Sequence, residues 1–218
     1  MERVTVQEAS SWSYRGLELF LVVPAVMMGL FGAVSLAVGV LGSGSASGGP
    51  GATAGVISAL AVGVGTVRLV MVPVGLVSII AIPVGLYFDA GMVRQQNLDW
   101  QPTKGLYAGL GFLFNSLVVW DYLYKRHRYV VDWVDSTFWW FLALVGIGIE
   151  AVGLVMASIE PSLFVISVVG LPFFALGIYK DATYVRLNSG WHPNPVTHFL
   201  AAFFSGIFSI IGLLYFAY

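Results

Sequence analysis

Residues 137–159, TFWWFLALVGIGIEAVGLVMASI, decide the fold class of this chain. The stretch carries one charged residue, Glu150, and is longer than the roughly 18 residues that mark a membrane-spanning helix. A strand of a membrane barrel would alternate apolar and polar residues, whereas this stretch is apolar at almost every position. Because backbone groups in hydrocarbon must pair internally, the stretch is predicted to form a transmembrane helix.

The composition extends this prediction to most of the chain. Its 218 residues are 58% hydrophobic and 10% charged, compared with roughly 45–50% and about 25% in soluble domains. Further apolar stretches cover residues 17–41, 69–88, 105–119, 163–179 and 199–218. The sequence therefore predicts an all-α protein, a polytopic bundle of transmembrane helices.

The number of spans depends on residues 52–88, an apolar run that is too long for one span. Arg68 interrupts this run, and the nearby Gly63, Gly65 and Pro73 are residue types that favour a turn. A break at Arg68 gives seven spans, which we predict. An unbroken run gives six spans, which is the alternative.

Two segments before this run are predicted to lie outside the hydrocarbon. Residues 1–15 are mixed polar and contain Trp12 and Tyr14, aromatic residues typical of the headgroup boundary. Residues 42–51, GSGSASGGPG, have no charge and no bulky side chain. They are predicted to form a flexible connector after the first span.

An internal repeat appears when the sequence is aligned with itself at an offset of about 92 positions. The matching pairs are Gly85 and Gly177, Tyr87 and Tyr179, Asp89 and Asp181, Ala90 and Ala182, Val93 and Val185, Arg94 and Arg186, and, after one residue of slippage, Asn97 and Asn188, Trp100 and Trp191, and Pro102 and Pro193. The order of these matches indicates two related halves.

Each half is predicted to contain three spans, and an odd number of spans inverts the second copy relative to the first. The chain then divides into residues 1–50 (interfacial segment, first span and connector), residues 51–128 (first three-helix repeat) and residues 129–218 (second three-helix repeat).

The distribution of basic residues predicts a multi-pass protein of the cell membrane with a cytoplasmic amino terminus. In the seven-span topology the cytoplasmic side carries Arg3, Arg15, Arg68, Lys125, Arg126, Arg128, Lys180 and Arg186, and the outer side carries Arg94 and Lys104. The six-span alternative buries Arg68 and divides the other basic residues almost evenly.

The repeated motif is Tyr-x-Asp-Ala-x-x-Val-Arg followed by Trp-x-Pro, and its candidate residues are Asp89, Arg94, Trp100, Pro102, Asp181, Arg186, Trp191 and Pro193. The favoured interpretation is structural, because these residue types anchor helices at the membrane interface. The functional interpretation places Asp89 with Arg94, and Asp181 with Arg186, in polar clusters at opposite mouths of a pathway.

Glu150 is the most specific single candidate, because it lies in the middle of an apolar stretch where a charge is costly. It could bind a proton or cation, or it could be a neutral acid that joins two helices. Arg68 and Asn115 are its predicted deep polar partners, and together the three residues are the candidates for an ion pathway.

Several classes of function lack support in the sequence. The net charge is −1 with no long basic run, which argues against nucleic acid as a partner. The chain has no cysteine, and its three histidines lack the spacing of metal ligands, so neither metal nor cofactor is predicted. Motifs of hydrolases and nucleotide-binding enzymes are missing as well, and we predict no enzymatic activity.

The basic segment 122–128, YLYKRHR, is predicted to anchor a helix end to anionic lipid. With residues 179–182 (YKDA) and 191–193 (WHP), this segment resembles the uncharacterised small multi-pass membrane proteins of halophilic archaea. The resemblance covers roughly residue 69 to the carboxy terminus and implies an archaeal membrane protein, without an activity.

Two functions remain open. The favoured one is a non-catalytic module that binds membrane lipids, an apolar small molecule, or a membrane protein, including a second copy of the chain. The alternative is a small transporter or channel for protons or ions that uses Glu150 at the interface of the inverted repeats.

Overall fold

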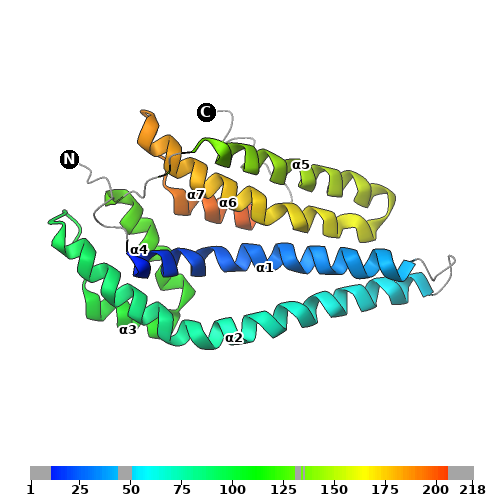
Figure 1. The fold of residues 1–218 in the computed structure, drawn as a ribbon, viewed down its shortest axis with the longest axis horizontal. Coiled ribbons are helices and arrows are strands. Elements are labelled where there is room, and N and C mark those ends of the chain that lie inside the picture. Colours follow the sequence, from blue (N-terminus) through cyan, green and yellow to red (C-terminus); the bar gives the residue numbers. More distant parts are fainter. Residues whose placement is uncertain (1–10, 44–50, 131–133, 135, 206–218) are drawn as a thin grey trace. The chain divides into compact units, whose positions relative to one another are not determined.

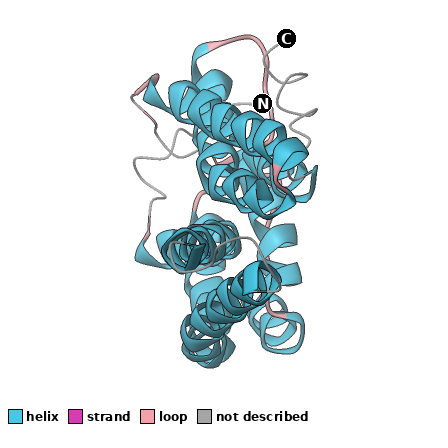
Figure 2. Cartoon of the chain, turned by 90° about the vertical axis from the view of Figure 1, so that its right-hand side faces the viewer, coloured by secondary structure: helices cyan, strands magenta, loops and turns pink. Residues whose placement is uncertain are grey.

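The computed structural model describes residues 11–43, 51–130, 134 and 136–205, and these residues form helices joined by short loops. The helices are α1 (Trp12–Ser43), α2 (Gly51–Gln95), α3 (Lys104–Phe114), α4 (Ser116–Tyr129), α5 (Phe138–Ile159), the short 3₁₀ helix η1 (Pro161–Phe164), α6 (Val165–Asn188) and α7 (Pro195–Ser205) (Figure 1). No strand occurs in this part of the chain (Figure 2). The predicted all-α class is confirmed.

Four helices are long and apolar enough to cross a membrane, and they cover Trp12–Gly39, Ile57–Gln95, Phe138–Ile159 and Pro161–Asn188. Their mean hydropathies lie between 2.1 and 2.5. Lengths of this kind exceed the roughly 20 residues that a helix needs to cross the hydrocarbon core. The described helices therefore have the lengths and composition of an integral membrane protein.

The predicted break at Arg68 is wrong, because α2 continues through this residue without interruption. Gly63 does not form a turn: it packs against α1, where an added Cβ would lie 3.0 Å from the ring of Phe31. Pro73 lies inside the helix, a position that membrane helices tolerate. Gly63 is thus used for helix contact, and the unbroken run of the six-span alternative is the one observed.

The predicted span at residues 105–119 is also divided. Asn115 separates α3 from α4 with a backbone φ of 41° and ψ of −111°. The two pieces are 11 and 14 residues long, and neither reaches the length of a membrane span. The last predicted span begins in α7, but residues 206–218 lie outside the described residues, as do residues 1–10 and 44–50.

The helices contribute to two compact units. Unit 1 consists of the described parts of residues 1–24, 73–139 and 178–200, and unit 2 of those of residues 25–72, 140–177 and 201–218. α2 and α6 both begin in unit 2 and end in unit 1. The predicted inversion is therefore not confirmed: both copies of the repeated motif lie at the ends of helices that enter the same unit.

Both motif copies reach unit 1 because of the elements between α2 and α5. Both α3 and α4 belong to unit 1, so the chain does not pass through unit 2 again before α5 begins.

Unit 2 is held together by glycines that bring α5 and α6 close together. A Cβ on Gly146 would lie 2.7 Å from the Cα of Phe174, and a Cβ on Gly170 would lie 2.6 Å from the carbonyl oxygen of Gly146. Gly153 and Gly177 meet the backbones of Ser167 and Ala143 in the same way. Small residues are the usual means by which membrane helices pack closely.

Candidate functional site

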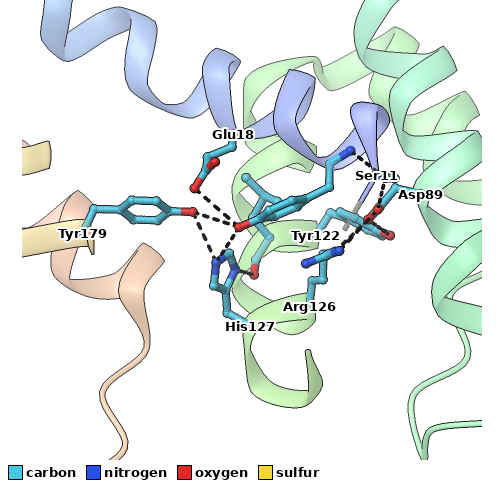
Figure 3. Close-up of polar contacts among 9 residues, drawn as sticks. Ser11, Glu18, Asp89, Tyr122, Arg126, His127 and Tyr179 are labelled. Carbon is cyan, nitrogen blue, oxygen red and sulfur yellow. Dashed lines mark hydrogen bonds and ion pairs between the residues drawn. The ribbon is translucent and has the colours of Figure 1, made fainter. Parts of the chain in front are cut away.

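A cluster of polar side chains lies in unit 1 and joins the first turns of α1 to α2, α4 and α6 (Figure 3). Its members, which we call the polar cluster, are Ser11, Tyr14, Glu18, Asp89, Tyr122, Arg126, His127, Tyr179 and Lys180. Tyr14 and Glu18 are four residues apart in α1, as are Tyr122 and Arg126 in α4. Each pair therefore lies on one face of its helix.

Asp89 and Arg126 form the centre of the cluster. The Nε of Arg126 donates to Oδ2 of Asp89 at 2.8 Å, and neither side chain is exposed to solvent. The hydroxyl of Tyr122 donates to the same oxygen at 2.7 Å, and Ser11 Oγ donates to Oδ1 at 3.0 Å. The carboxylate thus receives both a counter-charge and the hydrogen bonds that a buried anion needs.

Two groups of α4 keep their ordinary protonation states, Arg126 as a cation and Tyr122 as a neutral phenol. Burial lowers the pKa of Arg126, but the charge of Asp89, the hydroxyls of Tyr14 and Tyr122 and the hydrogen bond to Asp89 together outweigh burial and raise it. The guanidinium also lies over the ring of Tyr14, 3.8 Å from its centroid. Burial, followed by the negative charge of Asp89, raises the pKa of Tyr122 far above its usual value. Tyr122 therefore remains a hydrogen-bond donor.

His127 is the second centre of the cluster, and its ring is buried. Its Nδ1 lies 2.7 Å from the carbonyl oxygen of Leu123, which can only accept, so Nδ1 carries the proton and Nε2 is the acceptor in the neutral ring. Nε2 faces the hydroxyls of Tyr14 and Tyr179, each at 3.2 Å. Burial, followed by the charge of Arg126, lowers the pKa of His127 to about 4.

Glu18 and Lys180 complete the cluster with an ion pair of 2.6 Å between Oε1 and Nζ. Their side chains are 15% and 22% exposed, so this pair is the part of the cluster that meets solvent. Tyr14 connects it to His127, because its hydroxyl lies 3.5 Å from Oε1 of Glu18. With a neutral His127, the two carboxylates and two cations of the cluster sum to zero charge.

The two copies of the repeated motif have different environments in unit 1. Asp89 binds Arg126 of α4, while Arg94 is exposed. In the second copy, Asp181 is buried, and Arg186 donates to the carbonyl oxygens of Pro193 and Arg128. Both copies belong to unit 1, and the functional interpretation of the motif as two mouths of a pathway stays a prediction.

The Trp-x-Pro part of the motif also differs between the copies. Trp100 packs in an aromatic group with Tyr107, Tyr122 and Tyr129, at centroid distances of 6.2, 5.4 and 6.0 Å. Trp191 is 38% exposed, with its ring 5.7 Å from that of His198. Pro102 and Pro193 are both buried. Trp100 therefore contributes a ring to the surroundings of the polar cluster, next to Tyr122.

Glu150 and Arg68, two of the three predicted pathway residues, belong to unit 2, and the third, Asn115, belongs to unit 1. Glu150 is 1% exposed in unit 2, where Gly170 of α6 packs against it and Ser167 Oγ donates to its backbone oxygen at 3.0 Å. Arg68 is exposed on α2. Asn115 lies in unit 1, and its side-chain amide donates to Ser78 Oγ at 3.2 Å.

The predicted lipid anchor of residues 122–128 is divided between two faces of α4. Lys125 and Arg128 point outward, where Lys125 pairs with Asp121 and Arg128 lies over the ring of Tyr124. Arg126 and His127 are buried instead. The prediction of an anchor is therefore wrong for these two residues, because acids and hydroxyls on other helices meet them.

Sequence reasoning did not select Glu18, Tyr179 and Lys180 as site residues. The signal that could have found them is a pairing of charges at the ends of apolar helices, since two acids, Glu18 and Asp89, need two cations. Comparisons of the chain with protein-family models, curated proteins and solved structures gave no match. The resemblance to halophilic archaeal membrane proteins stays a prediction.

Proposed function

We propose that the chain is a non-catalytic multi-pass membrane protein that binds an apolar partner, which is a lipid, an apolar small molecule or another membrane protein. The polar cluster supports a structural role in this proposal. Its charges are neutralised within the chain, and its hydroxyls and ring nitrogens have partners. A network of this kind fixes helices in place and presents no spare charge to an ion.

The observation that carries the proposal is the exposed apolar face of α2. In unit 1 this face shows Leu76, Ile80, Val84 and Tyr87, which are 64, 70, 47 and 46% exposed. Their spacing of three and four residues places them on one side of the helix. α2 is also the least covered of the four candidate spans, with 17% of its window buried. A large exposed apolar surface is typical of contact with lipid or a partner.

The proposed topology has four spans, α1, α2, α5 and α6, with unit 1 on the cytoplasmic side. The described basic residues of unit 1 are Arg15, Arg94, Lys104, Lys125, Arg126, Arg128, Lys180 and Arg186, whereas those of unit 2 consist of Arg68. Cytoplasmic segments carry the excess of Lys and Arg in membrane proteins. This topology keeps the cytoplasmic amino terminus and moves Arg94 and Lys104 to the inside.

The test is purification in a mild detergent, followed by mass spectrometry of whatever lipid, pigment or protein co-purifies. The double variant Leu76→Ala/Ile80→Ala should lose the bound partner. The matched control is Val155→Ala on α5, where the parent residue is 65% exposed, and it should keep the partner. Recovery of the chain with nothing bound, or equal loss in both variants, contradicts the proposal.

A second candidate function is transport of protons or ions, and the burial of Glu150 favours it. A carboxyl group that is 1% exposed in an apolar helix is a common feature of proton and ion pathways. The test is proton or ion flux in liposomes. Glu150→Gln should abolish flux, whereas Glu160→Gln, at the exposed end of α5, should not. Parent flux equal to that of empty liposomes contradicts this candidate.

A further inference from the structure

The surroundings of His127 favour the neutral imidazole ring over the protonated ring. The ring is 1% exposed and donates from Nδ1 to the Leu123 carbonyl. Its Nε2 has one lone pair, which accepts from Tyr14 or Tyr179. When Tyr179 donates to His127, the hydroxyl of Tyr14 can donate to Glu18. Nδ1 of His127 and the hydroxyls of Tyr179 and Tyr14 then each have an acceptor as long as the ring is neutral.

The charged groups around His127 come from all of the helices that meet there. α4 contributes Arg126, α6 contributes Lys180, and α1 contributes Glu18, while Asp89 of α2 lies beyond Arg126. Arg126 and Lys180 repel a proton on the ring. Glu18 and Asp89 attract it, but each already binds one of these two cations.

His127 also connects α4 to α1 and α6, since its two tyrosine partners belong to those helices. Two further bonds hold the end of α4: Asn194 donates to the carbonyl of Tyr124, and Arg186 donates to that of Arg128. An amide does not titrate, and arginine stays charged at all ordinary pH values. Of the groups that make these bonds, the imidazole of His127 is therefore the one whose ordinary pKa lies near neutral pH.

We propose that His127 is a proton-sensing site that loosens the attachment of α4 to α1 and α6 in acid. Any open state in which the ring meets water binds a proton more readily than the closed state does. By linkage, acid then favours the open state by about tenfold for each pH unit below the ordinary pKa of histidine, until the closed state is protonated as well.

The test is hydrogen–deuterium exchange of the α4 amides, Ser116–Tyr129, in detergent at pH 7.5 and pH 5.0, after correction for intrinsic exchange rates. In the parent, the opening equilibrium of α4 should rise about 30-fold at the lower pH. His127→Gln should not show this rise. His198→Gln, which changes a histidine on α7 outside the cluster, should respond as the parent does, and α5 amides should stay unchanged.

Equal protection of α4 at both pH values in the parent overturns the proposal, and so does an unchanged rise in His127→Gln. A second measurement on the parent covers the case in which His127→Gln does not fold. The sequence has three histidines, so selective labelling and NMR titration resolve the ring of His127. Titration near pH 4 supports the proposal, whereas titration at or above pH 6.5 overturns it.

Discussion

At the scale of single residues, the ion pair between Asp89 and Arg126 is the contact on which the polar cluster most depends. Both side chains are fully buried, and the carboxylate also accepts from Tyr122 and Ser11. Desolvation of two charges offsets most of their attraction, so the pair adds little to stability as a whole. Removal of one partner has a different effect, because the other charge then stays buried without compensation.

Asp89→Asn should therefore lower the stability of the protein by about 3–5 kcal/mol. Thermal melting in detergent, followed by circular dichroism, measures this loss. Asp121→Asn is the matched control, because Asp121 also binds a cation, but the side chains of Asp121 and Lys125 are 49% and 43% exposed. It should change stability by less than about 1 kcal/mol. Equal losses in the two variants would show that Asp89 does not act through its burial.

The buried neutral ring of His127 leads us to predict that global stability decreases as the pH is lowered. Its pKa in the folded protein is about 4, compared with an ordinary value of about 6.5 in the unfolded chain. The stabilisation that comes from the neutral ring is fully present above pH 6.5. Between pH 6.5 and 4 the unfolded chain binds a proton that the folded protein does not, and stability falls by up to about 1.4 kcal/mol per unit.

Melting temperatures measured between pH 7.5 and 4.5 check this dependence. The slope should be smaller in His127→Gln than in the parent, while His198→Gln should keep the slope of the parent. An identical slope in all three proteins would assign the acid sensitivity to other groups.

At the scale of elements, the glycines of α5 and α6 decide how closely two helices approach. Gly146 and Gly148 lie two residues apart on α5, in different surroundings. A Cβ on Gly146 would meet the backbone of Phe174, whereas a Cβ on Gly148 would have no atom within 4 Å. The two positions separate the effect of helix packing from that of backbone flexibility.

Gly146→Ala should destabilise unit 2 by about 3 kcal/mol, because a rigid backbone cannot move away from the added methyl group. Gly148→Ala should be neutral or stabilising by up to about 1 kcal/mol, because alanine has the higher helix propensity. Chemical denaturation in mixed micelles measures both changes. A loss of similar size in Gly148→Ala would mean that the open side of α5 is covered by a partner in solution.

At the scale of the whole molecule, the sequence predicted the helical class and three of the four long helices, α1, α5 and α6, because long runs of apolar residues form helices in hydrocarbon. It did not predict the unbroken α2 or the break at Asn115. Glycine and proline favour turns in water, yet in a membrane helix Gly63 serves close packing instead. The break between α3 and α4 falls at Asn115, where neither a glycine nor a proline marks it.

The polar cluster shows the same limit for the candidate site. The repeat predicts Asp89 as a site residue. The basic segment predicts its partner Arg126 as part of a lipid anchor, because basic segments at helix ends usually face solvent or lipid headgroups. The burial of Arg126 is decided by α1 and α2, which lie far from α4 in the sequence. Contacts of this kind follow from the packing of helices, and spacing within one segment does not encode them.

The proposed four-span topology predicts which side of the membrane each part of the chain faces. The chain has no cysteine, so a single introduced cysteine reports its own location to a membrane-impermeant maleimide. Arg94, Arg128 and Glu160 are exposed, the first two in unit 1 and the third in unit 2. In the four-span topology, Arg94→Cys and Arg128→Cys should react only after cells are permeabilised, whereas Glu160→Cys should react in intact cells. Labelling of Arg94→Cys and Arg128→Cys from opposite sides would mean that the chain crosses the membrane between them, through α3 and α4. Labelling of all three from one side would mean that α5 does not cross the membrane.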